Sequence, residues 1–496
     1  MSHLTTSKAA HTKVNDFYAM DINHGLEDTV HETEEMLSCM QIFSPRLDTT
    51  QGSNGGGSVC QRPRTEIKDF PPEILGKVFE HCISDSDPAV IYFKSLSTPM
   101  KLAQVSWTWR SVAFSVPRLW NEVVVDYGDL KNIHQLAQAT HNHLVHSNAL
   151  PIIIHTKGSL LNGSPGPVRG DFIMNLLSPY ANRIRHLTLS FPVELMNQFL
   201  QQRVAGFTIP VLESVTLVYR RMGPRVHLVP VNVFAHAPRL RTFEIKYALR
   251  VPDLELDLQW DQITELNFVR LIIPSAQVSS ILRRCLNLQN CTLTVPKEYP
   301  FEETNFLPAT DSILPSIRCL TLYNEKDNNY DNYLAGIEFP SLERLNVMFI
   351  GNQSKWEQGQ FMSLQRRSRC TLRVLSTSAH VGHENIEAIL GDVPSLTELD
   401  VLEGQPISAS TLRLICNGLL APNLEVLRCA VEPDMLSDFL DMLDCRHVPR
   451  KSRATYRGIK SAVVSCSKAT EGYRNVRKRL KELKSDGRDV KIIDKS

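Results

Sequence analysis

Between residues 184 and 429 the chain repeats one short apolar pattern, which constrains its fold more than any other feature. Ten stretches share the spacing apolar-x-x-apolar-x-apolar, and their starts are 23 to 30 residues apart. Apolar and polar residues alternate over the last four positions, which predicts a β-strand that is buried on one face. The stretches are IRHLTL (184–189), LESVTL (212–217), LRTFEI (240–245), ITELNF (263–268), LQNCTL (288–293), IRCLTL (317–322), LERLNV (342–347), LRVLST (372–377), LTELDV (396–401) and LEVLRC (424–429).

The fifth position of every stretch is polar. Successive side chains of a strand point to opposite faces of the sheet, so we expect these ten side chains to point away from the core. They form a candidate binding surface, although the pattern does not show which of them would touch a partner. The ten residues are Thr188, Thr216, Glu244, Asn267, Thr292, Thr321, Asn346, Ser376, Asp400 and Arg428.

The segments between the strands contain helical periodicity, for example ENIEAILGDV and SASTLRLICNGLL. In six repeats a proline stands two residues before the first apolar position, where it ends the preceding helix. Strand, turn and helix at this period are typical of leucine-rich repeats, whose units bury their apolar faces by stacking. We therefore expect an α/β fold over residues 123–496. It would be an irregular solenoid whose curved parallel sheet has helices on its convex side and the ten polar positions on its concave face.

Further elements are expected at both ends of the repeats. PIIIHT (151–156) predicts an opening strand, and SAVVSC (461–466) and DVKIID (489–494) predict two closing strands. A basic amphipathic helix at 474–487 would close the edge, within a C-terminal cap at about 446–496.

A small helical domain is predicted at residues 67–122. Pro72 suits the first position of a helix and Glu73 its first turn, and apolar residues follow at helical spacing. Thr98 predicts the cap of a second helix, Ser106 that of a third, and Pro117 ends the third. Residues 1–66 are predicted to be disordered, with a linker at 51–64 and a possible short helix at 25–40.

The segment 70–120 resembles the F-box of fungal F-box proteins. The matching residues are Phe70-Pro71-Pro72-Glu73, Val78-Phe79, SWTWR (106–110) and Pro117-Arg118-Leu119-Trp120; Phe70, Val78 and Ser106 depart from the commonest residues of the family.

The resemblance implies that the helices dock on the Skp adaptor of a Skp–cullin–F-box ubiquitin ligase, while the repeats hold the protein to be ubiquitinated. The alternative, that the same side chains form the domain's own core, remains open because amphipathic helices always bury one face. The contact residues that the resemblance implies are Pro71, Pro72, Ile74, Leu75, Val78, Phe79, Leu102, Val105, Trp109 and Trp120.

We therefore expect a non-enzymatic substrate-recognition subunit without cofactor or metal, whose partners are a Skp-type adaptor, a cullin through that adaptor, and an unidentified target. The histidines of THNHLVH (140–146) and HVGHE (380–384) match no standard metal-site spacing. Two alternatives are a repeat scaffold that delivers no substrate and a nucleic-acid-associated protein. The second would use residues 451–496, which hold 14 Lys or Arg against 5 Asp or Glu. A solvated face on a capping helix explains that charge more simply.

Composition places further bounds on the protein. A net charge of +1 gives no general reason to expect nucleic acid or membrane as a partner. The eleven cysteines are scattered without a CxxC pair, which indicates buried thiols in a reducing compartment. The chain starts without the apolar segment of a signal peptide and contains no run of roughly 20 apolar residues. We expect an intracellular protein in the cytoplasm, the nucleus or both.

Overall fold

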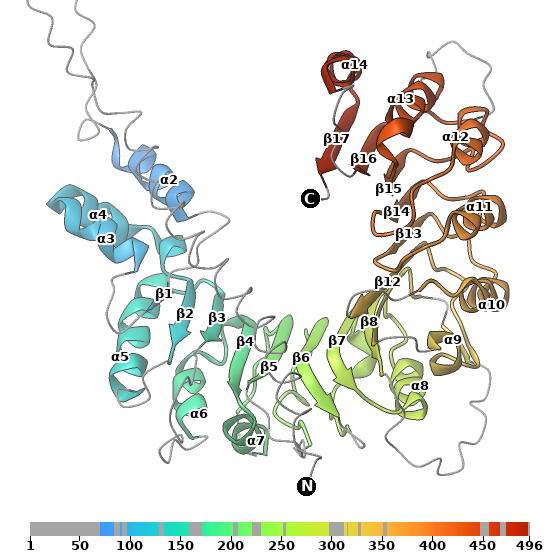
Figure 1. Ribbon diagram of the computed structural model, residues 1–496. Coiled ribbons are helices and arrows are strands. Elements are labelled where there is room, and N and C mark those ends of the chain that lie inside the picture. Colours follow the sequence, from blue (N-terminus) through green and yellow to red (C-terminus); the bar gives the residue numbers. More distant parts are fainter. Residues whose placement is uncertain are drawn as a thin grey trace, which may run out of the picture. The chain divides into compact units, whose positions relative to one another are not determined.

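A computed structural model describes most of the chain beyond residue 69 (Figure 1). The chain divides into two units, residues 1–65 and 66–496, and the described residues all belong to the second unit. The predicted disordered region, linker and helix at 25–40 lie outside the described residues. These are 70–83, 90–91, 97–127, 133–157, 171–201, 207–220, 230–250, 254–296, 312–314, 316–325, 329–350, 355–446, 456–466 and 473–494.

Fifteen strands form one sheet in which neighbouring strands are parallel and follow the order of the chain. A separate pair, β9 (Ser312–Ile313) and β11 (Ile337–Glu338), is also parallel. The strands of the large sheet are β1 (Val90–Ile91), β2 (Glu122–Asp126), β3 (Ile152–Lys157), β4 (Ile184–Pro192), β5 (Ser214–Arg220), β6 (Thr242–Arg250), β7 (Glu265–Ile272), β8 (Asn290–Val295), β10 (Cys319–Glu325), β12 (Arg344–Ile350), β13 (Val374–Thr377), β14 (Glu398–Val401), β15 (Val426–Ala430), β16 (Ser461–Cys466) and β17 (Asp489–Asp494).

The ten repeated stretches supply β4 to β8, β10 and β12 to β15, so each predicted strand is present. The flanking strands predicted from PIIIHT, SAVVSC and DVKIID are β3, β16 and β17. The sheet nevertheless begins two strands earlier than predicted, with β1 and β2. A run of three valines, Val123 to Val125, was the signal for β2, and all three are buried. β1 lies in a segment that the F-box resemblance leaves as a loop.

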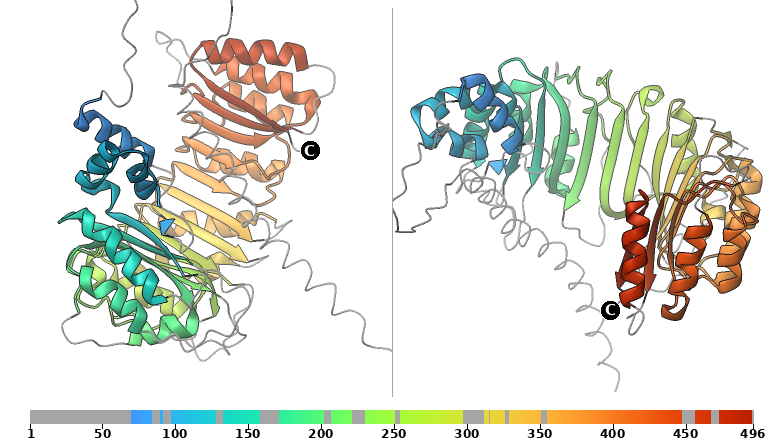
Figure 2. Two further views of the ribbon diagram at one scale, coloured as in Figure 1. Left: turned by 90° about the vertical axis from the view of Figure 1, so that its left-hand side faces the viewer. Right: turned by 90° about the horizontal axis from the view of Figure 1, so that it is seen from above.

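Helices connect many of the strands and bury their apolar side against the sheet (Figure 2). In α8, for example, Val278, Ile281 and Leu282 are buried, at the spacing that places side chains on one side of a helix. These helices are α5 (Ile133–Leu144), α6 (Asp171–Leu177), α7 (Val193–Gln201), α8 (Ser275–Arg284), α9 (Tyr330–Tyr333), α10 (Gln358–Ser368), α11 (His383–Asp392), α12 (Ala409–Cys416), α13 (Leu436–Cys445) and α14 (Tyr473–Ser485). Short 3-10 helices are η4 (Val145–Ser147), η5 (Ser178–Tyr180), η6 (Trp260–Gln262) and η7 (Pro433–Met435).

The core of the repeats is organised in rows across the strands. The fourth position of each stretch pairs with the fourth position of the next, and every member of this row is at most 2% exposed. Since a slip of one residue would turn the whole set toward solvent, burial of this row fixes the register. The row consists of the ten fourth positions and of their register partners in β16 and β17: Leu187, Val215, Phe243, Leu266, Cys291, Leu320, Leu345, Leu375, Leu399, Leu427, Ala462 and Val490.

Three helices near residue 70 form a helical head with its own core, α2 (Pro72–Ile83), α3 (Thr98–Val105) and α4 (Trp107–Ser115), followed by the 3-10 helix η2 (Pro117–Leu119). Pro72 begins α2 as predicted. The Ser106 hydroxyl caps α4 by accepting a hydrogen bond of 3.1 Å from the Trp109 amide, which confirms that prediction. The predicted start of α3 is one residue late, because Ser97 holds the cap position and Thr98 is already helical.

Candidate functional site

The helical head divides the ten predicted adaptor contacts into two groups. Four of them are buried in the head's own core, so they are not available to another chain: Leu75, Phe79, Leu102 and Trp120. Two prolines are exposed, Pro71 and Pro72, and Trp109 is partly buried. Three aliphatic side chains are exposed, Ile74 at 51%, Val78 at 42% and Val105 at 58%. The core interpretation is thus correct for the first group, and the docking interpretation remains a prediction for the exposed residues.

The exposed apolar side chains lie on defined sides of the helices. Ile74 and Val78 are four residues apart in α2, so they are neighbours on one face of that helix. Val105 ends α3, and Trp107 begins α4 with 79% of its surface exposed. Neighbouring exposed apolar side chains, such as Ile74 and Val78, are typical of a surface that binds another protein.

Trp107 was missed by the sequence reasoning, which selected Trp109. The two residues are two positions apart on a helix, so they point to nearly opposite sides. The Trp109 ring packs on Phe79, with 4.9 Å between ring centroids, and Trp107 consequently faces solvent. The spacing of the two tryptophans in WTWR was the signal that could have identified Trp107, since only one of them can face the core.

Trp120 connects the helical head to the repeats. Its indole nitrogen donates a 2.8 Å hydrogen bond to the Ala113 carbonyl, and its ring stacks on Phe114 at 5.1 Å. The ring also packs against two histidines of the repeats, with 5.0 Å between ring centroids for His143 and 4.9 Å for His146. Burial lowers the pKa of His143 to about 4, so this imidazole is neutral at physiological pH.

The histidines considered as metal ligands have other partners. The His141 ring nitrogen Nδ1 is 2.7 Å from the Tyr180 hydroxyl. Nδ1 of His380 lies 3.2 Å from the Glu403 carbonyl, and His383 Nδ1 lies 3.1 Å from Gln405 Oε1. Among the residues that the structure describes, no three His, Cys, Asp or Glu side chains are grouped so that they could hold a metal ion.

The ten fifth-position residues form one polar row on the sheet face opposite the buried row. Each of them pairs in register with its counterpart in the next strand, from Thr188 in β4 to Arg428 in β15. All ten are partly exposed, as the alternation predicts. The same register continues to His155 in β3 on one side and, on the other, through the apolar Val463 in β16 to Lys491 in β17. The structure therefore brings together residues that span more than 300 positions of the sequence.

Side chains of the polar row bind one another across the strands. Thr216 donates a 3.0 Å hydrogen bond to Glu244, and Asn346 donates one of 3.0 Å to Thr321.

Ion pairs extend these contacts. Lys246 Nζ is 3.2 Å from Glu244, and Arg428 is 3.2 Å from Asp400. A row of this kind offers hydroxyl, amide and charged groups, which is the chemistry of the polar part of protein interfaces.

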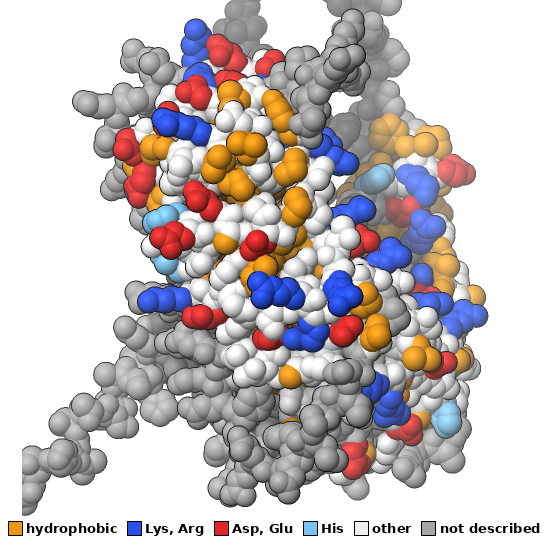
Figure 3. Space-filling model, turned by 90° about the vertical axis from the view of Figure 1, so that its right-hand side faces the viewer, with side chains coloured by type: hydrophobic (Ala, Val, Ile, Leu, Met, Phe, Trp, Pro, Cys, Tyr) orange, Lys and Arg blue, Asp and Glu red, His pale blue; other side chains and the backbone are white. Residues whose placement is uncertain are grey.

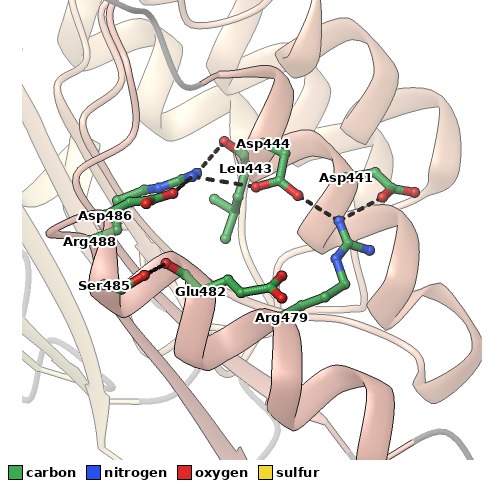
Figure 4. A network of polar contacts seen from close by, with 8 residues as sticks. All are labelled: Asp441, Leu443, Asp444, Arg479, Glu482, Ser485, Asp486 and Arg488. Carbon is green, nitrogen blue, oxygen red and sulfur yellow. Dashed lines mark hydrogen bonds and ion pairs between the residues drawn. The ribbon is translucent and has the colours of Figure 1, made fainter.

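The basic C-terminal stretch pairs partly with acidic groups of the repeats (Figure 4). The guanidinium of Arg479 on α14 is 2.7 Å from both Asp441 and Asp444 of α13. Arg488 donates a 2.8 Å hydrogen bond to the Leu443 carbonyl and lies 3.4 Å from Asp444. The Arg479 contacts attach α14 to α13, and those of Arg488 attach the segment after α14 to the end of α13, which is the role expected of a C-terminal cap.

Charge on the face drawn in Figure 3 is mixed. Lys and Arg side chains are interspersed with Asp and Glu over the described residues of that face. Nucleic-acid binding relies on neutralising successive phosphates with a basic surface. Neither the pairing of Arg479 with two aspartates nor this mixed face favours such a role.

Comparison with known proteins does not identify a family. A scan against protein-family models and a search of curated proteins each found no match to this chain. In the described part of the chain, every helix is too short or too polar to cross a lipid bilayer. The F-box resemblance and the roles that it implies therefore remain predictions.

Proposed function

We propose that the protein is a non-enzymatic substrate-recognition subunit of a Skp–cullin–F-box ubiquitin ligase. The observation that carries this proposal is the helical head, which has a closed core and still exposes Ile74, Val78, Val105 and Trp107. The F-box resemblance covers the same helices, and it implies a Skp-type adaptor as the partner that covers these side chains.

The energetics of the head agree with this role. Burying a large aliphatic or aromatic side chain contributes roughly 1.5–3 kcal/mol. The exposed side chains of the head obtain only part of this burial free energy in the unbound protein, and the rest becomes available when a partner covers them. An interface of standard size, about 1,600 Å² in total, would cover them together with the surrounding polar groups.

The polar row is the proposed surface for the target protein. Its side chains stand on neighbouring strands of one hydrogen-bonded sheet, so their backbone positions are held before a target binds. The protein would then accelerate ubiquitin transfer by holding a target lysine near the charged partner of the ligase, which raises its effective concentration.

Adaptor binding is tested with two double variants of the full chain. Ile74→Asp with Val78→Asp places charge on the exposed face of α2, whereas Leu286→Asp with Leu419→Asp does so at two exposed leucines outside the head. Leu75 is unsuitable for this test, because it is 1% exposed and its substitution would damage the head's core. We expect a purified Skp-type adaptor to capture the wild-type protein and the second variant but not the first. Equal capture of both variants would show that α2 is not the docking face.

A second experiment separates the ligase role from a scaffold role and a nucleic-acid role. A ligase subunit co-purifies with cullin, and deletion of residues 70–120 stabilises its bound target in cells. A scaffold would retain cullin without any such stabilisation. Binding to nucleic acid would instead fall steeply between low and 0.5 M salt.

A further inference from the structure

Two accessible cysteines occupy matching positions in neighbouring repeats. Cys416 is the last residue of α12 and is partly exposed, and Cys445 is the last residue of α13 and is exposed. The two helices pack against each other as successive members of the array. Five other described cysteines are buried: Cys285, Cys291, Cys370, Cys429 and Cys466.

The ends of α12 and α13 are joined by the residue that follows Cys445. Arg446 is completely buried, and its Nη1 donates a 3.1 Å hydrogen bond to the carbonyl of Ile415, the neighbour of Cys416. Its Nη2 donates a 3.1 Å hydrogen bond to the Ala421 carbonyl in the turn after α12. The guanidinium also lies 5.0 Å from the centre of the Tyr456 ring. These contacts hold the two cysteine-bearing ends together.

The Cys445 thiol affects the ionisation of Cys416. Burial, followed by interaction with the Cys445 thiol, raises the pKa of Cys416 to about 11. Cys416 is therefore a protonated thiol at neutral pH. Cys445 is the more accessible of the two and is the side chain that a dissolved oxidant meets first.

We propose that Cys416 and Cys445 are a redox modification site, at which a peroxide converts the two thiols to a reversible disulfide. The Cys445 sulfur attacks one oxygen of hydrogen peroxide, the O–O bond breaks, and a sulfenic acid and one water result. The Cys416 sulfur then attacks the sulfenic sulfur. The S–S bond forms, and the hydroxyl leaves with the Cys416 proton as a second water. Two thiols are oxidised, and one peroxide is reduced to two waters.

The disulfide would tie α13 to α12 across a loop of about 28 residues and restrict opening of the C-terminal repeats. This inference does not depend on the proposed ligase role. The buried cysteines provide an internal comparison, since burial raises the pKa of Cys285 to about 12 and shields its thiol from oxidant.

The test uses the full chain with Cys39, Cys60, Cys82 and Cys319 changed to serine. Cys82 is exposed, Cys319 is partly exposed, and the other two lie outside the described residues. The protein is treated with hydrogen peroxide, alkylated, and digested with trypsin without reductant. We expect mass spectrometry to find peptide 414–428 linked to peptide 429–446, with the loss of two hydrogens. The second peptide also contains Cys429, so its fragment ions must place the link at Cys445.

Matched variants complete the test. Cys416→Ser and Cys445→Ser should each abolish the linked peptide, whereas Cys429→Ala should retain it. Oxidised protein should unfold several degrees higher than reduced protein, and dithiothreitol should reverse the shift. Oxygen addition at Cys445 without a linked peptide would overturn the proposal, as would a link to Cys429 or one that survives in Cys416→Ser.

Discussion

Ile74 and Leu75 are neighbours in α2 with opposite environments, and shortening each to alanine separates a core role from a surface role. Leu75 is 1% exposed within the head's core, and Ile74 is 51% exposed. A leucine-to-alanine change in a closed core costs about 2–5 kcal/mol from lost burial and the cavity left behind. Removing atoms from Ile74 should cost less than about 0.5 kcal/mol, because no core cavity forms.

Hydrogen exchange of the full chain measures both costs locally. Amides of residues 72–83 and 107–115 exchange through opening of the head, at a rate set by its local stability. The expected cost predicts that Leu75→Ala accelerates this exchange by roughly thirty- to a few thousand-fold, since 1.4 kcal/mol corresponds to tenfold. Ile74→Ala should change it by less than about threefold. Peptides from β12 to β15 report the repeats and should stay unchanged in both variants. Equal acceleration by both variants would refute the division of the head into core and exposed residues.

Three further predictions concern the repeats and their junction with the head. The pKa of His143 is about 4 in the folded chain and 6.5 in the unfolded chain. As the pH falls, the unfolded chain therefore binds this proton before the folded chain does. The free energy of unfolding should be highest above pH 6.5 and should fall by up to about 3 kcal/mol as the pH drops toward 4. Urea denaturation at pH 7.5 and pH 5 should show most of this loss in the wild type. The loss should be smaller in His143→Gln. Arg446→Met leaves the carbonyls of Ile415, Ala421 and Leu424 without their donor and should cost about 2–5 kcal/mol in urea denaturation, whereas Arg446→Lys should cost less. Asp400→Ala breaks a half-exposed ion pair with Arg428 and should cost at most about 1 kcal/mol, so a larger loss would mean that the pair is not solvated as the structure shows.

The repeated strands could be predicted because one signal determines them locally. An apolar residue at the fourth position and a polar residue at the fifth require opposite faces of the sheet, and the rows led by Leu187 and Thr188 follow this rule across all ten stretches. The predicted exposure of the ten fifth positions is therefore confirmed, and the structure adds that they pair in register. β2 was missed because its three consecutive valines are all buried, so it has no alternation to recognise.

The helical head was harder to predict, because amphipathic spacing does not tell an internal neighbour from a foreign one. Leu75 and Ile74 both belong to the apolar stripe of α2, and the packing of α3, α4 and η2 decides which of them is covered. Trp107 and Trp109 are the same residue type in the same helix, but only Trp109 packs on Phe79. Such choices depend on contacts between helices that are distant in sequence.

The most direct test of the account is hydrogen exchange of the wild-type chain with and without a purified Skp-type adaptor. We expect slower exchange in residues 72–83 and 98–115 when the adaptor is present, with β12 to β15 unchanged. The variant that carries Ile74→Asp and Val78→Asp should show no protection. An adaptor that protects no part of the head, or protects only the repeats, would contradict the account.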